Sequence, residues 1–326
     1  MGDVSTKKSC QSSEESSRFP KVSIIMNCYN GEEYLREAID SIYAQTFQDW
    51  EIIFWDNAST DKSAEIAKSY HDGRLRYFRS PDTVSLGEAR NYALEQVHGQ
   101  YIAFLDCDDI WLPEKLNKQI PILDKKSYVD FIYSNYFKII MPRVNKRILS
   151  LKGRQPEGDV FERFLYHYPV NLQTVIFRRE VLNKLDYCFD KKLSLSEEFD
   201  LFMRIFRNSH VSYMSEPLIV TRIHQNMRSI KYAKDFYDEC ILIAQKFKSD
   251  DNKFEYKYEQ ALKYFYAKAN YYRARFEMSK SNSRKAREYL STYKSISIKF
   301  FLLYLLTYFP VSVWRILHRA KDRGLA

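Results

Sequence analysis

The sequence predicts an α/β protein built on a doubly wound, mostly parallel sheet with helices on both faces. From Lys21 onward, apolar runs of strand length alternate with stretches of helical periodicity, which is typical of repeated βα units. The first of these runs has a continuous apolar core rather than an alternating pattern, as expected for a strand that helices cover on both faces. Polar residues follow three of the runs directly, at the sheet edge where ligands bind in such folds.

Two βα units open the predicted sheet. The first strand is VSIIMNC, residues 22–28, and residues 31–45 predict a helix because apolar side chains recur at helical spacing. The second strand is WEIIFWD, residues 50–56. The polar turn after it supplies Ser and Asp residues that can cap a helix over 62–71.

A third unit ends in an acidic turn. Residues 74–80 predict a short strand, residues 87–99 a helix, and residues 100–109 a buried strand that runs into an acidic tetrapeptide. Because the carboxyl ends of parallel strands meet at one edge, the functional site is expected there. The polar residues brought to that edge are Tyr29, Asn30, Asp56, Asp106, Asp108 and Asp109.

The second half of the domain is predicted from weaker patterns. Residues 133–154 are basic and rich in β-forming residues, which favours a hairpin, and residues 158–185 fit a helix, a strand and a second helix. A helix over 195–208 carries acidic residues in its first turn, and residues 211–224 follow as a strand. The α/β domain is therefore expected to cover residues 20–230.

The C-terminal third predicts helices. Residues 231–294 have helical periodicity and include two antiparallel helices joined around Ser279 to Ser283. Their spacing resembles one tetratricopeptide-type hairpin, which cannot bury a repeat core alone, so it either packs on the α/β domain or binds a partner. Residues 295–326 form an amphipathic tail that is both basic and aromatic.

The tail contains 15 uncharged residues, 300–314, interrupted by Pro310. A bilayer-spanning helix needs about 20 residues, so a helix lying in the membrane interface fits better, and a helix docked on the protein is the alternative. The net charge of +9 supports an acidic partner, since residues 231–326 hold 20 basic and 10 acidic side chains. We expect that partner to be an anionic membrane surface and expect no nucleic acid, because no aromatic-studded basic groove is evident.

The remaining composition indicates a cytoplasmic protein, peripheral at the inner face of the membrane. Residues 1–19 are polar and rich in Ser, which predicts a disordered leader rather than a signal peptide. The five cysteines are scattered without a CxxC pair, as expected for free thiols in a reducing compartment. A length of 326 residues with 45% hydrophobic residues excludes a small disulfide scaffold and a disordered chain.

The acidic turn after the third strand predicts a metal-dependent site. Asp106 and Asp108 lie at the exposed end of a buried strand, where two carboxylates need a cation or hydrogen-bond donors to offset their repulsion. Mg²⁺ and Mn²⁺ prefer oxygen ligands and keep positions open for substrate phosphates. Such a pair could hold a metal-diphosphate, although an Asp-x-Asp tripeptide alone is a weak signal.

Several motifs in order resemble those of family 2 glycosyltransferases of the GT-A fold. The resemblance covers about Lys21 to Leu116 and includes VSIIMNCYNGEEYL, WDNASTD, GEARN and FLDCDD. It implies a Rossmann-like, mostly parallel sheet with flanking helices, followed here by a C-terminal helical region. It also implies an inverting hexosyltransferase-type enzyme that moves a sugar from a nucleotide diphosphate sugar, usually a UDP sugar, to a hydroxyl of a glycan or lipid-linked acceptor.

The resemblance assigns the donor-binding residues one by one. Tyr29 matches a nucleotide-side aromatic residue that can pack on a base, and Asn30 stands beside it. Asp56 matches the acidic residue that accepts a hydrogen bond from the base. Arg90 matches a basic residue near the nucleotide or diphosphate, a role that suits a guanidinium. Asp106 would contact the ribose or the metal.

The resemblance also implies the metal ligands and the base. Asp108, with Asp106 and His224, would bind Mn²⁺ or Mg²⁺. The general base that removes the acceptor proton falls on Glu198, where the family usually has Asp. Glu197 and Asp200 are alternatives, and acidic residues in a first helical turn also stabilise the helix dipole without any catalytic role.

Two other functions compete with the transferase. A nucleotidyltransferase also combines an α/β sheet with paired acidic metal ligands, but it needs no second acidic motif and often grips phosphate with a glycine-rich loop, which the first strand lacks. A noncatalytic sugar-nucleotide-binding or scaffold protein would use the helical hairpin as its interaction surface. The acidic residues argue against it.

Overall fold

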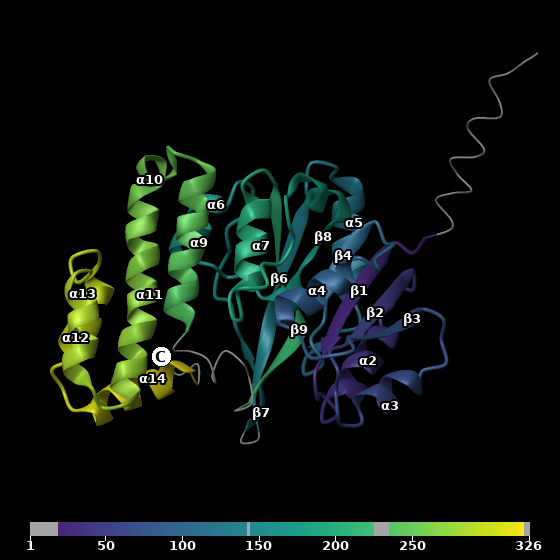
Figure 1. Cartoon of the computed structure of the whole chain (residues 1–326), viewed down its shortest axis with the longest axis horizontal. Coiled ribbons are helices and arrows are strands. Elements are labelled where there is room, and N and C mark those ends of the chain that lie inside the picture. The colour runs from purple at the N-terminus through teal and green to yellow at the C-terminus, as the bar shows by residue number, and fades with distance from the viewer. Residues whose placement is uncertain (1–18, 142–143, 225–234, 323–326) are drawn as a thin grey trace, which may run out of the picture.

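The computed structural model describes residues 19–141, 144–224 and 235–322. Residues 1–18 of the predicted leader and the predicted domain boundary at residues 230 and 231 lie outside these ranges. Figure 1 shows the sheet in the body of the molecule and the C-terminal helices grouped at one side.

The N-terminal half of the sheet is parallel. Strand β1 (Val22–Cys28) pairs in parallel with β2 (Trp50–Asp56) on one side and with β4 (Tyr101–Phe104) on the other, and β2 pairs in parallel with β3 (Leu75–Arg79). All seven residues of β1 are buried, as expected for a strand covered on both faces. The βα units predicted from the sequence therefore form as expected.

The second half of the sheet is mixed. The sheet order is β3-β2-β1-β4-β8-β6-β9-β5, with β7 paired to β6. Strand β8 runs antiparallel to both of its neighbours, and β6 and β9 are parallel to each other. These strands are β5 (Ile110–Trp111), β6 (Phe131–Ile140), β7 (Val144–Leu149), β8 (Ile176–Arg178) and β9 (Val211–Ile223).

Helices cover both faces of the sheet. One face packs on α2 (Leu35–Tyr43), α3 (Ser63–Lys68) and α5 (Lys115–Lys125). The other face packs on α4 (Leu86–Leu94), α6 (Phe161–Tyr166) and α7 (Glu197–Phe206). Between α6 and α7 lie two 3₁₀ helices, η1 (Leu172–Thr174) and η2 (Arg179–Lys184), and the second replaces the α-helix expected at the end of residues 158–185.

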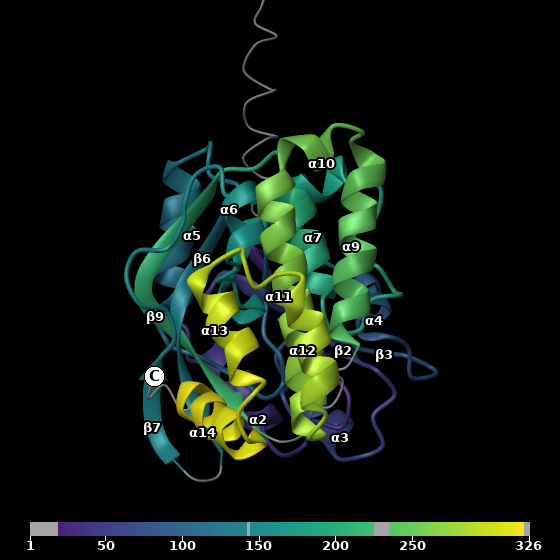
Figure 2. The ribbon, with the colours of Figure 1, turned by 90° about the vertical axis from the view of Figure 1, so that its left-hand side faces the viewer.

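The helical extension continues the core of the α/β domain. It consists of α9 (Phe236–Asp250), α10 (Phe254–Lys257), α11 (Glu259–Ser279) and α12 (Ser283–Ser291). Ile243, Phe247 and Leu262 belong to the same buried cluster as Phe202 of α7. Of the expected helical hairpin, α11 packs on the domain through α6, whereas α12 packs on the outer side of α11 (Figure 1 and Figure 2).

The tail forms two helices instead of the single helix expected. These are α13 (Ile298–Leu306) and α14 (Val311–Asp322), and Pro310 between them ends the continuity because proline lacks the N–H that a helix interior needs. Phe300 and Trp314 are buried against the extension, whereas other apolar side chains of both helices are exposed. Within the described ranges, the chain has no helix with the length and apolar character needed to cross a bilayer.

The turn after β2 holds a strained residue. Ala58 has φ +60°, the left-handed conformation that costs an L-residue about 1–2 kcal/mol. Replacing Ala58 by Gly should therefore raise the free energy of unfolding by about 1 kcal/mol, measured by urea titration. The same change at Ala64, inside α3, should lower it by about 1 kcal/mol. A destabilised Ala58→Gly protein would show that the turn is not strained.

Candidate active site

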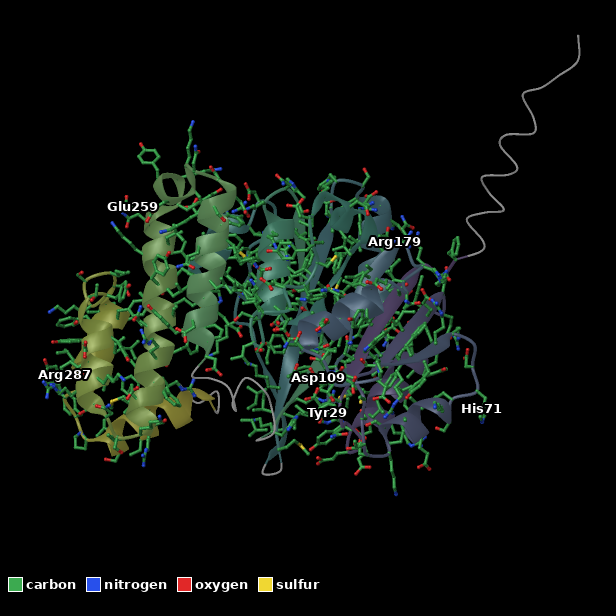
Figure 3. All side chains as sticks on the ribbon, viewed as in Figure 1. Tyr29, His71, Asp109, Arg179, Glu259 and Arg287 are labelled. Carbon is green, nitrogen blue, oxygen red and sulfur yellow. The ribbon has the colours of Figure 1, made fainter. Side chains whose placement is uncertain are left out.

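A cavity of about 970 Å³ lies at the carboxyl ends of β1 and β4. Figure 3 shows Tyr29 and Asp109 close together at this end of the molecule. The lining also includes Glu33 and Tyr34 just before α2 and Glu197 and Glu198 at the start of α7, so the cavity gathers several separate segments of the chain. The predicted site residues that line it are Tyr29, Asn30, Arg90, Asp106, Asp108, Glu197, Glu198 and His224.

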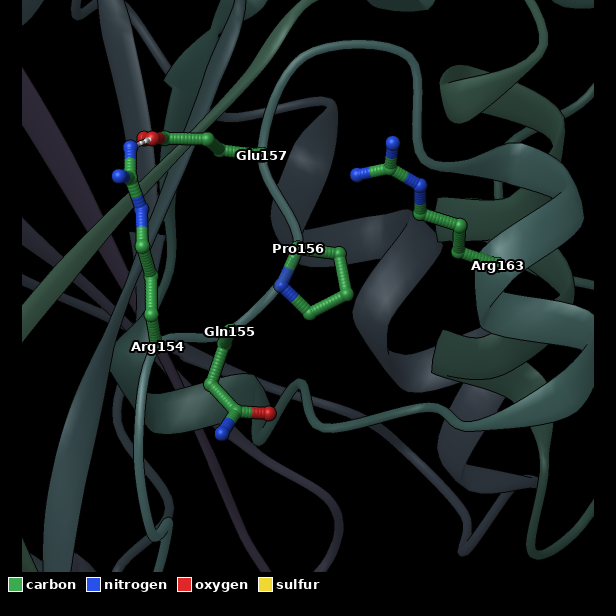
Figure 4. A pocket seen from close by; sticks show the side chains of 5 residues that line it. All are labelled: Arg154, Gln155, Pro156, Glu157 and Arg163. Atoms are coloured by element: carbon green, nitrogen blue, oxygen red, sulfur yellow. Dashed lines mark hydrogen bonds and ion pairs between the residues drawn. The ribbon is translucent and has the colours of Figure 1, made fainter.

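A second hollow on the surface is not part of this site. It measures about 360 Å³ and is lined by residues 154–157 and Arg163 (Figure 4). Its main polar interaction is the ion pair between Arg154 and Glu157, and the Arg154 side chain is 82% exposed. Because it shares no lining residue with the larger cavity, we assign the chemistry to the larger one.

Arg90 of α4 ties the two acidic motifs together. Its Nη1 donates to Glu197 Oε1 at 2.8 Å and its Nη2 to Asp106 Oδ1 at 3.3 Å, while Glu198 Oε2 lies 3.9 Å from Nη1. Burial opposes the charge on Arg90, but the surrounding carboxylates raise its pKa above the usual value. The guanidinium is thus held in a buried ion-pair network that fixes the start of α7 beside β4.

Glu198 is an unusual carboxylic acid. Burial, followed by the neighbouring charge of Glu197, raises the pKa of Glu198 to about 8, although Arg90 opposes the shift. Its side chain is 30% exposed and faces the cavity, whereas that of Glu197 is 2% exposed and paired with Arg90. Of the two glutamates, Glu198 is the one that a substrate could reach.

Asp106 is oriented by a residue that sequence reasoning missed. Gln173 Nε2 donates to Asp106 Oδ2, and Gln173 Oε1 accepts a hydrogen bond from the Asp106 backbone N–H at 2.9 Å. Burial raises the pKa of Asp106, and Arg90 opposes that shift. Gln173 lies in η1, far from Asp106 in sequence and without a recognisable motif, so only the fold reveals the pair.

Asp108 and His224 meet across the cavity. His224 Nε2 lies 2.9 Å from Asp108 Oδ2, and Arg222 Nη1 donates to the Asp108 carbonyl at 2.8 Å. The acidic turn is also attached to β9 through Asp109, whose Oδ1 accepts the Arg222 N–H at 2.9 Å. β9 thereby holds the acidic turn, and the residue that follows the strand brings a histidine to that turn.

These side chains suit an open metal site. Among the described residues, no three His, Cys, Asp or Glu side chains are grouped closely enough to hold a metal ion by themselves. Asp106, Asp108 and His224 supply two carboxylates and an imidazole, a donor set that Mn²⁺ or Mg²⁺ accepts when substrate phosphates and water complete the coordination. The carboxylates of Asp106 and Asp108 are the oxygen donors that such a cation would use beside a diphosphate.

Tyr29 and Asn30 form one wall of the cavity. The Tyr29 side chain is 54% exposed, so its ring is available to a ligand. Asn30 has φ +52°, its N–H donates to Ser59 Oγ at 3.0 Å, and its Oδ1 accepts the Thr60 N–H at 2.8 Å. Asn30 therefore joins the loop after β1 to the loop after β2 and holds Tyr29 at the mouth.

The structure does not bring Asp56 to the cavity surface. Asp56 is fully buried, and it accepts hydrogen bonds from the Ser59 N–H at 2.8 Å, the Tyr77 hydroxyl at 2.6 Å and Arg79 Nη1 at 2.6 Å. Its neighbour Asn57 lines the cavity instead. Asp56 thus orders the loop that forms the wall.

Asp200 also lies outside the cavity lining. It is fully buried, with Oδ2 2.9 Å from Arg204 Nη2 and Oδ1 2.7 Å from Lys246 Nζ. These two cations neutralise it beneath the first turn of α7. Asp200 is therefore placed to hold the first turn of α7 rather than to touch a ligand in the cavity.

Glu239 of the extension holds the loop that leads into α7. Its carboxylate accepts the backbone N–H groups of Ser194, Leu195 and Ser196, at 2.7, 3.0 and 2.9 Å. Ser194 and Leu195 line the cavity, and Glu197 follows directly. The side chain is buried, so three charge-assisted hydrogen bonds connect the extension to the site.

Comparison with known proteins decides the family. The family model described as glycosyl transferase family 2 matches residues 23–186, which is half of the chain. The chain belongs to glycosyl transferase family 2. The resemblance predicted from the motifs is thereby confirmed, and with it the membership in a family of transferase enzymes.

Two relatives of this family 2 chain extend the match. An uncharacterized glycosyltransferase of Rickettsia typhi is 32% identical over 208 residues, which are 63% of this chain and 64% of that protein, so the match spans less than two thirds of that relative. The Escherichia coli protein named UDP-Glc:alpha-D-GlcNAc-diphosphoundecaprenol beta-1,3-glucosyltransferase WfgD is 29% identical over 213 residues, 65% of this chain and 80% of that protein.

A solved structure confirms the predicted fold of this family 2 member. Residues 1–349 of TarS from S. aureus, crystallised in complex with UDP-GlcNAc, match with a TM-score of 0.66 and 21% identity, covering 93% of this chain and 92% of that one. The high coverage includes the C-terminal helices. The prediction of a GT-A sheet with a C-terminal helical region is therefore correct.

Proposed function

We propose that this protein is an inverting glycosyltransferase that moves a sugar from a nucleotide diphosphate sugar, most simply a UDP sugar, to a hydroxyl of a glycan or lipid-linked acceptor. The observation that carries the proposal is a single cavity, in a family 2 chain, that joins the acidic turn 106–109 to Glu198. Donor-binding and base groups are both needed for transfer, and this cavity holds candidates for each.

The nucleotide is assigned to the β1 side of the cavity. The exposed Tyr29 ring can stack on the base, and Asn30 keeps it in place. Asp56 acts on the nucleotide side by ordering the loop that carries Asn57. Asp106 is assigned to the ribose or the metal.

The diphosphate is assigned to Asp108 and His224, which with Asp106 would hold Mn²⁺ or Mg²⁺. The bound cation would neutralise charge on the leaving diphosphate. Arg90 adds a fixed positive charge behind Asp106 and acts mainly by holding the carboxylates in place. The protein groups thus orient the donor with its anomeric carbon toward α7.

Glu198 is assigned as the general base. Its carboxylate takes the proton of the acceptor hydroxyl, the acceptor oxygen bonds to the anomeric carbon, and the bond to the diphosphate oxygen breaks on the opposite face. This displacement inverts the anomeric configuration. Glu197 and Asp200 hold the first turn of α7, and so the position of Glu198. Glu197 does so through its buried ion pair with Arg90, and Asp200 through ion pairs with Arg204 and Lys246.

A donor panel tests the proposal. Purified protein is incubated with UDP-, GDP- and TDP-linked sugars plus Mn²⁺, with membrane extract as the acceptor source, and nucleoside diphosphate release is measured. We expect release with one donor class, and an acceptor-linked product of inverted configuration. Donor binding with no release under any acceptor would favour a binding protein, and release of pyrophosphate from a sugar phosphate and a nucleoside triphosphate would favour a nucleotidyltransferase.

We further propose that α13 and α14 hold the enzyme on the cytoplasmic face of an anionic membrane, where a lipid-linked acceptor would lie. Eight apolar side chains of this tail are at least 37% exposed: Ile298, Phe301, Leu302, Leu305, Tyr308, Phe309, Ile316 and Leu317. Arg287 and Arg315 lie at their border. Aromatic and aliphatic side chains beside cations suit an interfacial surface.

Vesicle binding checks this surface. Replacing Leu302 and Phe309 by Ser should lower binding to phosphatidylglycerol-containing vesicles roughly tenfold in a sedimentation assay, because two exposed side chains would no longer enter the lipid. Tyr256→Ser is the matched control, since Tyr256 is 91% exposed on α10, away from the tail. Equal binding by all three proteins would refute the membrane surface.

A further inference from the structure

Two cysteines meet at the floor of the cavity without a part in the proposed reaction. The register of β1 and β4 pairs Val22 with Tyr101 and Ile25 with Phe104. Carried three residues beyond the last pair, the same offset places Cys28, the last residue of β1, near Cys107, the middle residue of the Asp-Cys-Asp turn. Alternation of side chains along each strand turns both toward the sheet face that packs on α2.

The two sulfur atoms lie against the same glycine. A Cβ added to Gly31 would stand 2.7 Å from Cys107 Sγ and 2.9 Å from Cys28 Sγ, so the sulfurs are no more than about 5.6 Å apart. A larger residue at position 31 would press against both thiols and displace at least one of them.

The geometry suits a covalent link. Paired strands lie about 4.8 Å apart, and cysteines whose Cα atoms are about 4.4–6.8 Å apart can be bridged with little backbone movement. Both residues line the cavity, which gives a small oxidant a route to them. In the described part of the chain the other two cysteines are elsewhere, Cys188 before α7 and Cys240 buried in α9.

We propose that Cys28 and Cys107 are an oxidation site, at which hydrogen peroxide converts the two thiols into a reversible disulfide. One thiol is oxidised to a sulfenic acid while hydrogen peroxide is reduced to water. The second thiol attacks that sulfur, the S–S bond forms, and the sulfenic oxygen leaves as a second water. Two electrons pass from the two thiols to one peroxide molecule, and a dithiol reductant reverses the link.

A disulfide between Cys28 and Cys107 would change the shape of the cavity, and the effect on ligand binding rests on the proposed function. Bringing the sulfurs to about 2.05 Å draws the acidic turn toward the end of β1. Asp106 and Asp108 flank Cys107, so their carboxylates would leave the positions that Gln173 and His224 now fix. Oxidation should therefore weaken binding of a metal-bound nucleotide sugar.

Peptide mapping tests the site directly. The full-length protein is treated with hydrogen peroxide, the remaining thiols are alkylated, and a digest is read by mass spectrometry without reduction. We expect a peptide pair joined through Cys28 and Cys107, lost after dithiothreitol and absent from Cys28→Ser and Cys107→Ser. Cys188→Ser should keep it. Thiols that stay free, or that reach sulfinic acid without a link, would overturn the proposal.

Nucleotide binding tests the consequence separately. UDP binding with Mn²⁺ is measured by calorimetry before and after oxidation, using the Cys188→Ser protein to limit side reactions. We expect affinity to fall at least about tenfold on oxidation and to return with dithiothreitol. Reduced protein that binds no nucleotide would contradict the proposed function and leave the mapped disulfide standing, whereas unchanged affinity in the linked protein would refute the effect on the cavity.

Discussion

Replacing Glu198 by Gln should lower kcat about 10³-fold while donor binding changes little. The amide keeps the size of the side chain but cannot take the acceptor proton, and positioned general bases contribute about 10²–10⁴-fold. Glu198 faces the cavity, whereas its neighbour Glu197 is paired with Arg90, so loss of the base should not dismantle the network. Steady-state kinetics and UDP calorimetry together separate the two effects.

The same carboxyl group should set the pH dependence of the reaction. A general base acts as the carboxylate, and the pKa of about 8 means that Glu198 is mostly protonated at pH 7. The rate should therefore rise with pH, about tenfold per unit below pH 8, and level off above it. The residual rate of Glu198→Gln should lack this rise.

Glu162→Gln is the matched control. Glu162 also lies in the first turn of a helix, α6, but it is exposed and outside the cavity. The kcat of Glu162→Gln should stay within a factor of two of the wild-type value, and its rate should rise with pH as the wild-type rate does. A Glu198→Gln enzyme with full kcat would exclude Glu198 as the base.

Replacing Asp108 by Asn should lower kcat/KM about 100-fold and raise the Mn²⁺ concentration needed for half-maximal rate. Asparagine nearly preserves shape but removes the negative charge that faces His224 and would face the cation. Loss of one such electrostatic contact costs about 10²–10³-fold. Initial rates over a Mn²⁺ series give both quantities.

The control for that variant removes an aspartate at the surface. Asp186→Asn changes an exposed carboxylate outside the cavity and should leave the Mn²⁺ series unchanged. An Asp108→Asn enzyme with the wild-type metal requirement would place the cation elsewhere. Thermal unfolding of both proteins should agree within a few degrees, which separates loss of metal from loss of fold.

The sequence predicted those parts of the fold that are encoded locally. Periodicity predicts β1, β2, β3 and α7 because each strand or helix carries its own apolar pattern. Helix α5 was not predicted, since Pro121 lies in its middle and proline normally signals a break. The antiparallel insertion of β8 depends on long-range pairing that no local pattern records.

The residues of the site also fall into those that the sequence marks and those that only the fold reveals. Asp108 and His224 could be expected together because motifs mark both, whereas Gln173 has no motif and is recruited only by the packing of η1 against β4. Asp56 and Asp200 match acidic positions of the family motifs, but both are buried. Asp56 pairs with Arg79, and Asp200 pairs with Lys246. A motif therefore identifies the neighbourhood, and burial decides which carboxylate a ligand can reach.

The three hydrogen bonds that Glu239 accepts bear on how such enzymes can be recombined. The matched family segment stops at residue 186, whereas Glu198 and the helix that anchors its loop come later in the chain. A chimera joined after β9 and His224 would keep the residues of the cavity and Glu198. It would lack Glu239, however, so the loop that leads into α7 would no longer be held in place. A recombined enzyme should therefore take α7 and α9 from the same parent, because Glu239 of α9 holds the loop that leads into α7.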